Sequence, residues 1–319
     1  MILNVDKKDL HIGISACLIG EKVRFDASSK PSKFCINELS QHATFKSFCP
    51  EVAIGLPVPR KTIRQIKQND LITVSRPDGS GDVTRALAAY GKKVAGLTKN
   101  LSGYIFCAKS PTCGMERVKV YSPEGNSLKS NGIGVFANEI MKANPLLPCE
   151  ENGRLNDPLI RENFIARVYA YKHWQQLTES GLTKHKLTSF HSQYKYTVMS
   201  HDLIAYKQLG QLLARADIAL EPMAEQYISG LMQALKTLAT RKKHANTLAH
   251  IQGYFSKHLQ CNERKELTQQ IHDYRLGLIP LMAPLTLIKH YLLQYPKNYL
   301  AKQSYLSPYP EQLKLRYAY

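Results

Sequence analysis

Residues 101–114, LSGYIFCAKSPTCG, place an apolar run directly before a turn that carries two cysteines, a serine, a proline and a glycine. The run has the length and the aromatic content of a buried strand. A rigid sheet holds such a turn in a fixed position, so reactive side chains in the turn can serve a site. The stretch therefore predicts a buried strand followed by a turn whose reactive side chains belong to a functional site.

Short β-rich runs alternate with helical patterns on both sides of this stretch. The predicted strands cover residues 9–17, 51–56, 70–76 and 101–110, and the predicted helices cover residues 35–45, 82–100 and 132–143. This alternation favours an α/β fold with a mostly parallel, Rossmann-like sheet, whose functional groups gather beyond the carboxyl ends of the strands. Cys17 and Ser110 fall at such ends.

The second half of the chain has mainly helical periodicity, in contrast to the alternating strands and helices of the first half. The stretch KANPLLPCEENGRLNDP, residues 142–158, is rich in proline and polar residues and is the predicted linker. Asp157 offers an N-cap with Pro158 at the first helical position, and nearly everything from there to about residue 305 has helical periodicity. We therefore expect two domains, an α/β domain over 1–150 and an all-α domain over 151–319.

The charge balance points to a polyanionic partner. The chain has 43 Lys and Arg residues against 25 Asp and Glu residues, a formal net charge of +18, and both halves carry an excess of cations. In residues 183–196, TKHKLTSFHSQYKY, and 239–250, ATRKKHANTLAH, cations stand among aromatic residues or histidines. Such cations neutralise phosphates, and aromatic rings stack on bases, so the helical half is a predicted RNA-binding domain.

No secretory or membrane-spanning pattern is visible. The first residues, MILNVDKKDLHIGIS, lack a long apolar run, and Pro280 and Pro284 interrupt the most apolar late stretch. The expectation is a cytoplasmic protein with no membrane association. In that reducing compartment the seven cysteines are metal ligands, catalytic thiols or small core residues rather than a disulfide set.

Three of the cysteines, Cys17, Cys49 and Cys113, stand in turns next to predicted strands and are flanked by glycine or proline. Their wide spacing is not a local metal signature, and the chain contains no CxxC pair. Folding could still bring them to one point. The other four are expected in the core or away from the site, with Cys107 as a reserve ligand: Cys35, Cys107, Cys149 and Cys261.

Several stretches resemble known families. ISACLIGEKVRFD (14–26), CPEVAIGLPVPR (49–60) and KSPTCG (109–114) resemble, in order and spacing, the thiouracil desulfidase family of the TudS type. NDPLIRENFIARVYAY (156–171) and the later helical segments resemble the YbgA-type helical domain. A chain that joins both is similar to the RudS-type desulfidases, which remove sulfur from 4-thiouridine in tRNA.

The resemblance implies a 4Fe-4S cluster held by Cys17, Cys49 and Cys113 with one iron left open. An open position can bind substrate, here the soft thiocarbonyl sulfur of the base. Glu51 is then the implied general base or acid, and Ser110 the implied contact to the base or the attacking water. Tight-turn geometry suits this role, because Gly114 permits close approach of the backbone.

Alternatives remain open at this point. Glu51 and Ser110 also fit an exposed loop carboxylate and an ordinary turn hydroxyl. The substrate could be a free thiopyrimidine base such as 2-thiouracil. A non-catalytic RNA-binding protein with a structural metal would need a fourth ligand, such as His42 or Cys107. The partner expected is tRNA, and no obligate protein partner is inferred.

Overall fold

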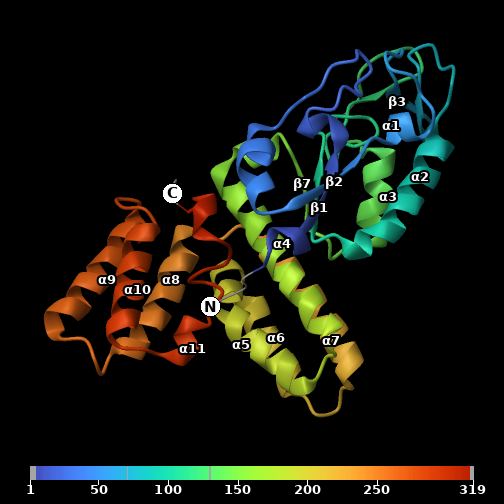
Figure 1. The fold of residues 1–319 in the computed structure, drawn as a ribbon. Helices are drawn as coiled ribbons and strands as arrows, with labels where there is room; N and C mark the ends of the chain where they lie inside the picture. The colour runs from blue at the N-terminus through green and yellow to red at the C-terminus, as the bar shows by residue number, and fades with distance from the viewer. Residues whose placement is uncertain (1–4, 70, 129–130, 317–319) are drawn as a thin grey trace. The chain divides into compact units, whose positions relative to one another are not determined.

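The computed structural model describes residues 5–69, 71–128 and 131–316, which divide into two units between Asp157 and Pro158. The first unit holds a four-stranded sheet in the order β2-β1-β5-β7, with all neighbours parallel (Figure 1). Its strands are β1 (His11–Ser15), β2 (Thr44–Phe48), β5 (Gly103–Phe106) and β7 (Cys149–Glu151). The predicted α/β fold with a mostly parallel sheet is confirmed.

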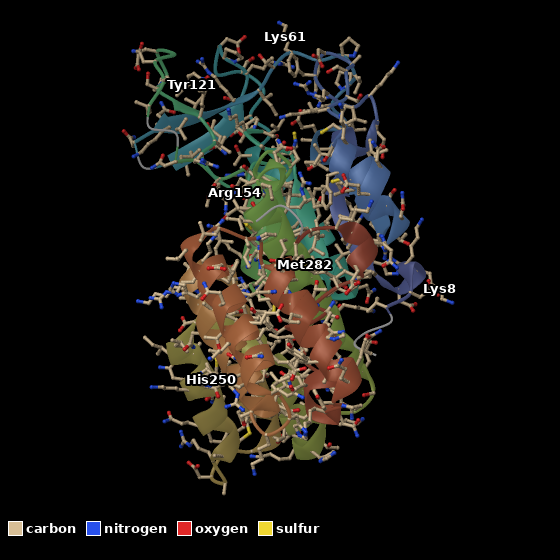
Figure 2. The ribbon with its side chains drawn as sticks, turned by 90° about the vertical axis from the view of Figure 1, so that its left-hand side faces the viewer. Lys8, Lys61, Tyr121, Arg154, His250 and Met282 are labelled. Atoms are coloured by element: carbon tan, nitrogen blue, oxygen red, sulfur yellow. The ribbon has the colours of Figure 1, made fainter. Side chains whose placement is uncertain are left out.

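A second, smaller sheet in this unit has the order β4-β3-β6. β3 (Arg64–Gln68) pairs antiparallel with β4 (Leu71–Ser75) and parallel with β6 (Val120–Tyr121). The guanidinium of Arg64 lies over the ring of Tyr121, whose side chain is labelled in Figure 2, at 4.8 Å from the ring centroid. The contact ties two strands of the small sheet together.

The helices of this unit are α1 (Pro50–Ala53), α2 (Thr84–Leu97) and α3 (Val135–Ala143), with α2 packed on α3. The unit also contains short 3₁₀ turns and one π turn: Lys7–Asp9, Ala16–Ile19, Phe34–Glu38, Leu39–Gln41, Thr98–Asn100 and Arg154–Asn156. Fully buried rings form the core beside the main sheet, where Tyr104 stacks on Phe106 at 4.2 Å between centroids.

Three expectations for this unit are wrong. Residues 51–56 are not a strand, because Pro50 starts helix α1 there with Cys49 at its N-cap. Residues 35–45 are not one helix, since short turns end before β2, an edge strand, begins at Thr44. The segment 142–158 is no free linker, because β7 within it pairs with β5, and the boundary therefore falls after Asp157 rather than after residue 150.

The second unit is helical, and α4 begins at Pro158 as predicted. Its core is built from the apolar faces of the later helices around Leu248, Phe255 and Leu285, which are at most 1% exposed. Its helices are α4 (Pro158–Glu179), α5 (Lys184–His201), α6 (Leu203–Ala214), α7 (Leu220–Lys236), α8 (Arg241–Gln252), α9 (Cys261–Leu276), α10 (Met282–Gln294) and α11 (Asn298–Ala301), with 3₁₀ turns at Gly253–Phe255 and Glu311–Leu313.

The aromatic rings of the helical segment 183–196 are buried, whereas several cations of the same unit are exposed. Phe190, Tyr194 and Tyr196 are core residues, each at most 3% exposed. They are therefore not available to stack on bases. Cations of the same unit, such as Arg241 and Lys242 at the start of α8, face solvent, as does His250 further along that helix (Figure 2). Within the described residues, no helix is long and apolar enough to cross a bilayer.

Candidate active site

Three neighbouring strands of the main sheet end at the same edge. Cys17 lies two residues beyond β1, Cys49 follows β2 directly, and the segment from Cys107 to Cys113 follows β5. Because β2, β1 and β5 are adjacent and parallel, their carboxyl ends meet. The order of the strands therefore brings together cysteines that are far apart in sequence.

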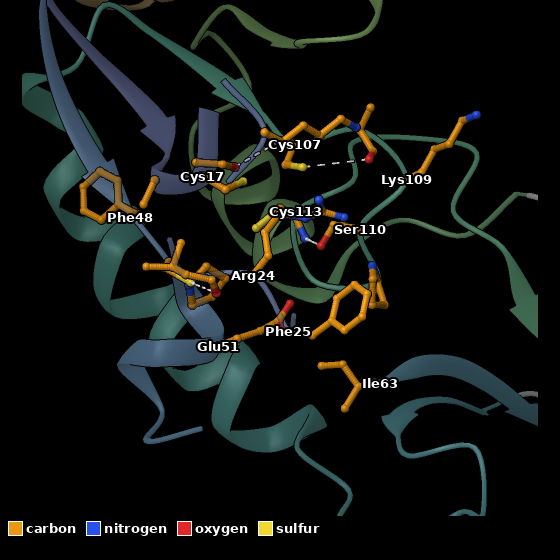
Figure 3. A pocket seen from close by; sticks show the side chains of 18 of the residues that line it. Cys17, Arg24, Phe25, Phe48, Glu51, Ile63, Cys107, Lys109, Ser110 and Cys113 are labelled. Carbon is orange, nitrogen blue, oxygen red and sulfur yellow. Dashed lines mark hydrogen bonds between the residues drawn. The ribbon is translucent and has the colours of Figure 1, made fainter. Parts of the chain in front are cut away.

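A cavity of about 220 Å³ opens at this edge. All five residues predicted for the site line it: Cys17, Cys49, Glu51, Ser110 and Cys113. Figure 3 shows the labelled cysteines around one space, with the carboxylate of Glu51 approaching from α1. The structure thus brings the predicted residues together, while their individual roles stay predictions.

The structure distinguishes between the two candidates for a fourth metal ligand, Cys107 and His42. Cys107, expected in the core, is buried yet lines the same cavity, where its thiol hydrogen-bonds with that of Cys17. His42 precedes the first residue of β2, whereas Cys49 follows its last, so His42 stands at the opposite edge of the sheet. His42 does not line the cavity, and Cys107 is the reserve ligand that the fold supports.

The loop of Cys113 is held by backbone contacts. Amide groups of the N-cap and first turn of α3 donate to it: Gly134 N to Gly114 O at 2.7 Å and Phe136 N to Thr112 O at 3.1 Å. Gly134 makes this approach possible, because a Cβ there would lie 2.5 Å from the Thr112 carbonyl. Gly114 is equally confined, as predicted, since its Cβ would meet Ser110 O at 2.8 Å.

A chain of hydrogen bonds links this loop to Glu51. Ser110 Oγ accepts from the amide of Cys113 at 3.1 Å and lies 2.8 Å from Thr112 Oγ1. Thr112 Oγ1 donates to Glu51 Oε1 at 2.8 Å. Ser110 therefore shapes the loop of a predicted ligand and, through Thr112, holds the carboxylate.

Arg60 completes this arrangement and was missed from the sequence. It donates from Nε and Nη2 to Oε2 of Glu51, and its side chain is 6% exposed against 14% for Glu51. Nη2 also donates to Val23 O at 2.9 Å. The sequence could have indicated this role, because Arg60 is the last residue of the motif CPEVAIGLPVPR, which also carries Cys49 and Glu51.

Burial shapes the chemistry of the thiols. Desolvation raises the pKa of Cys49 and of Cys113, and the hydrogen bond to Cys107 together with burial raises the pKa of Cys17. The same hydrogen bond, with smaller contributions from Lys30 and Arg24, lowers the pKa of Cys107 to about 7. A buried thiolate is costly by itself, and a bound cationic centre offsets that cost.

The donor set suits a soft metal centre of more than one atom. Within the described ranges, no three His, Cys, Asp or Glu side chains are grouped to hold a single metal ion. In an iron-sulfur cluster each thiolate binds a different iron, so the thiolates need not converge on one atom. Thiolate ligands in a partly apolar cavity are what such clusters require.

Comparisons with known proteins agree with this division. Residues 12–152 match the family described as 2-thiouracil desulfurase, and residues 195–310 match the family described as a protein of unknown function, DUF1722. The "Uncharacterized protein YbgA" of Escherichia coli (strain K12) is 35% identical over 161 residues, which are 49% of this chain and 94% of that protein. A solved structure titled "[4Fe-4S]-dependent thiouracil desulfidase TudS" is 28% identical, covers 46% of this chain and 93% of its own, and has a TM-score of 0.38.

The first unit, with its cavity at the carboxyl edge of a parallel sheet, is thus a domain of the thiouracil desulfurase class. The chain belongs to the family of YbgA, whose match covers 49% of it, and it carries this domain in addition.

Proposed function

We propose that this protein removes sulfur from 4-thiouridine in tRNA, using a 4Fe-4S cluster held by Cys17, Cys49 and Cys113. The observation that carries the proposal is the meeting of these three thiols with Glu51 and Ser110 in one cavity. The match of the domain to the thiouracil desulfurase family supports the reaction type. When bound, the cluster supplies a soft Lewis acid that polarises the thiocarbonyl group.

The chain's own residues provide the rest of the reaction. A water attacks the ring carbon that bears sulfur, and Glu51 accepts its proton. The carbon–sulfur bond breaks, a carbonyl forms at the same carbon, and sulfur leaves as hydrosulfide, so no electrons are gained or lost. Arg60 and Thr112 fix the two carboxylate oxygens, so that the base is positioned before substrate arrives.

The helical unit supplies affinity for tRNA in this proposal. Its described surface carries lysines and arginines at helix starts, among them Lys184 on α5 and Arg241 and Lys242 on α8. Cations of this kind neutralise phosphates without reading sequence. Because the rings in the same segments are buried, contact with the phosphate backbone rather than base stacking is the proposed mode.

A free thiopyrimidine is the second candidate substrate, and the description of the matched family favours it. The two substrates are separated by comparing sulfide release from thiolated tRNA with release from 2-thiouracil by the same preparation. The proposal requires the tRNA to be preferred, and a preference for the free base would replace it.

Cysteine variants test the cluster itself. Anaerobically prepared protein should contain iron and acid-labile sulfide, and Cys113→Ala should lose both together with sulfide release. Cys261→Ala is the matched control, since Cys261 is an exposed residue at the start of α9. Cys107→Ala should keep its iron. Loss of iron in Cys107→Ala would show a fourth protein ligand and would contradict an open iron.

A further inference from the structure

The cavity has an excess of positive charge at its mouth. Its lining includes the cations Arg24, Lys30, Arg60 and Lys109 but only one carboxylate, Glu51, which is paired with Arg60. Within the part of the chain that the structure describes, the other three cations form no ion pair with a carboxylate. Arg24 donates from Nη1 to Ser28 Oγ at 3.0 Å and keeps further donors, so three positive charges line the cavity without a direct carboxylate partner.

Arg24 and Lys30 lie near the thiol of Cys107, and the two lysines are open to solvent. The charges of Lys30 and Arg24 both act on the Cys107 thiol. Lys30 and Lys109 are exposed, and Figure 3 shows the side chain of Lys109 extending away from the cysteines. Phe25, 39% exposed, lies beside the guanidinium of Arg24 at 5.7 Å from its ring centroid. The mouth thus combines cations with an open aromatic ring.

Backbone hydrogen bonds hold the loops that carry Lys30 and Phe25. Lys30 N donates to Cys17 O at 2.9 Å, and Arg60 N donates to Phe25 O at 2.8 Å. Lys109 has a φ of 65°, in the left-handed region, which costs a residue with a Cβ about 1 kcal/mol.

We propose that Arg24, Lys30 and Lys109 bind the phosphates on either side of a thiolated nucleotide whose base enters the cavity. This inference rests on the proposed desulfidase function and names its substrate class as a phosphodiester-linked nucleotide. Free thiouracil is neutral and has no phosphate group with which the three cations could interact. The exposed ring of Phe25 is available to stack on a neighbouring base.

The size of the cavity also supports a base inside it and phosphates at its mouth. At about 220 Å³, part of which the proposed cluster would fill, it is smaller than the roughly 300–1,000 Å³ of sites for drug-sized ligands. A single pyrimidine ring is therefore the part of a nucleotide that enters, and the sugar and phosphates stay at the mouth. Lysine and arginine there provide charge-assisted hydrogen bonds to phosphate oxygens.

The test is equilibrium binding by the full-length protein, measured calorimetrically with two ligands, 4-thiouridine and 4-thiouridine 3′,5′-bisphosphate. The bisphosphate should bind at least about tenfold more tightly, the effect of one charge-assisted hydrogen bond. The double variant Lys30→Gln/Lys109→Gln should lose most of this preference and leave the affinity for the nucleoside unchanged. Lys92→Gln/Lys93→Gln, two exposed lysines of α2, is the control with the same change of charge.

Equal affinity for the two ligands, or no measurable binding of either, would overturn the proposal. So would a double variant that loses iron while it keeps the preference for phosphate, because the lysines would then balance the thiolates instead. Failure of the proposed function has a different signature. Sulfide would be released from neither tRNA nor free base, while the preference for the bisphosphate and its loss in the double variant would persist.

Discussion

Arg60 donates two hydrogen bonds to one oxygen of Glu51, from Nε at 2.9 Å and from Nη2 at 2.6 Å. The same guanidinium donates to Val23 O, and the backbone amide of Arg60 donates to Phe25 O. One residue therefore fixes both the proposed catalytic carboxylate and the loop that carries Arg24 and Phe25. Arg60 is a positioning residue, since it acts through its neighbours.

Replacing Arg60 tests this role. We expect Arg60→Lys to lower the rate of sulfide release about 100-fold, the lower range for a misplaced general base, because an ammonium group cannot reproduce the planar fork. Iron content should stay unchanged, which separates positioning from loss of the cluster. Arg85→Lys, an exposed residue of α2, is the control. An unchanged rate in Arg60→Lys would contradict the role assigned to the ion pair.

Gly134 offers a test of the loop that carries Cys113. Its φ of −60° suits any residue, so Gly134→Ala acts only through the added Cβ, 2.5 Å from the Thr112 carbonyl. We expect a loss of about 1–3 kcal/mol in the free energy of unfolding, as in other overpacked sites, and reduced iron per chain. Urea unfolding and iron analysis measure the two effects.

Gly96→Ala is the matched control for this change. Gly96 lies in α2, and a Cβ there would meet nothing within 4 Å. Alanine in a helix interior is favoured over glycine by about 0.5–1 kcal/mol, and Gly96 is the second-last residue of α2, so a gain of at most this size is expected. If both variants kept full iron content and stability, the close contact at Gly134 would have no structural importance.

A buried ion pair anchors the end of the described chain to the first helix of the helical unit. Arg316 Nε donates to Glu162 Oε1 at 3.0 Å, and the two side chains are 10% and 11% exposed. Arg316→Met leaves Glu162 without its cation, and we expect a loss of about 3–5 kcal/mol in the free energy of unfolding. Trp174, the single tryptophan of the chain, reports this unit by its fluorescence.

The matched control is an ion pair at the surface of the same unit. Arg215 and Asp217 are 56% and 64% exposed, so Arg215→Met should change the free energy of unfolding much less than Arg316→Met does. Equal effects of the two substitutions would show that burial of the Arg316 pair does not matter.

Acid should destabilise the helical unit through its buried histidines. Burial lowers the pKa of His173 and of His191 to about 4, and it also lowers the pKa of His201 and of His244. The unfolded chain binds protons at about pH 6.5, where the folded chain does not. Stability is therefore complete above pH 6.5 and falls as the pH drops toward 4, by up to about 1.4 kcal/mol per pH unit for each histidine.

Urea unfolding followed by Trp174 fluorescence at pH 7.5, 6 and 5 measures this loss. His173→Gln should reduce the slope, while His250→Gln, at an exposed position, should not. A free energy of unfolding that is the same at pH 7.5 and pH 5 would rule out the effect.

The sequence was sufficient for much of the fold where local patterns are strong. Apolar runs with sharp ends gave β1, β4 and β5, and Pro158 marked the start of α4. The sequence was misleading where a neighbouring residue or tertiary pairing outweighs the local hydrophobic pattern. Residues 51–56 look like a strand, yet Pro50 favours a helix start, and β7 is visible only through its pairing with β5.

For the site, the sequence by itself determined three cysteines in turns next to predicted strands, and the family resemblance of their motifs implied the ligand role of these cysteines and the acid–base role of Glu51. Only the tertiary structure decided that they share a cavity, that Cys107 joins them, and that Arg60 and Thr112 hold Glu51. The Thr112–Glu51 bond joins positions 61 residues apart. Strand order alone creates such a contact, and strand order follows from packing of the whole domain rather than from any local stretch.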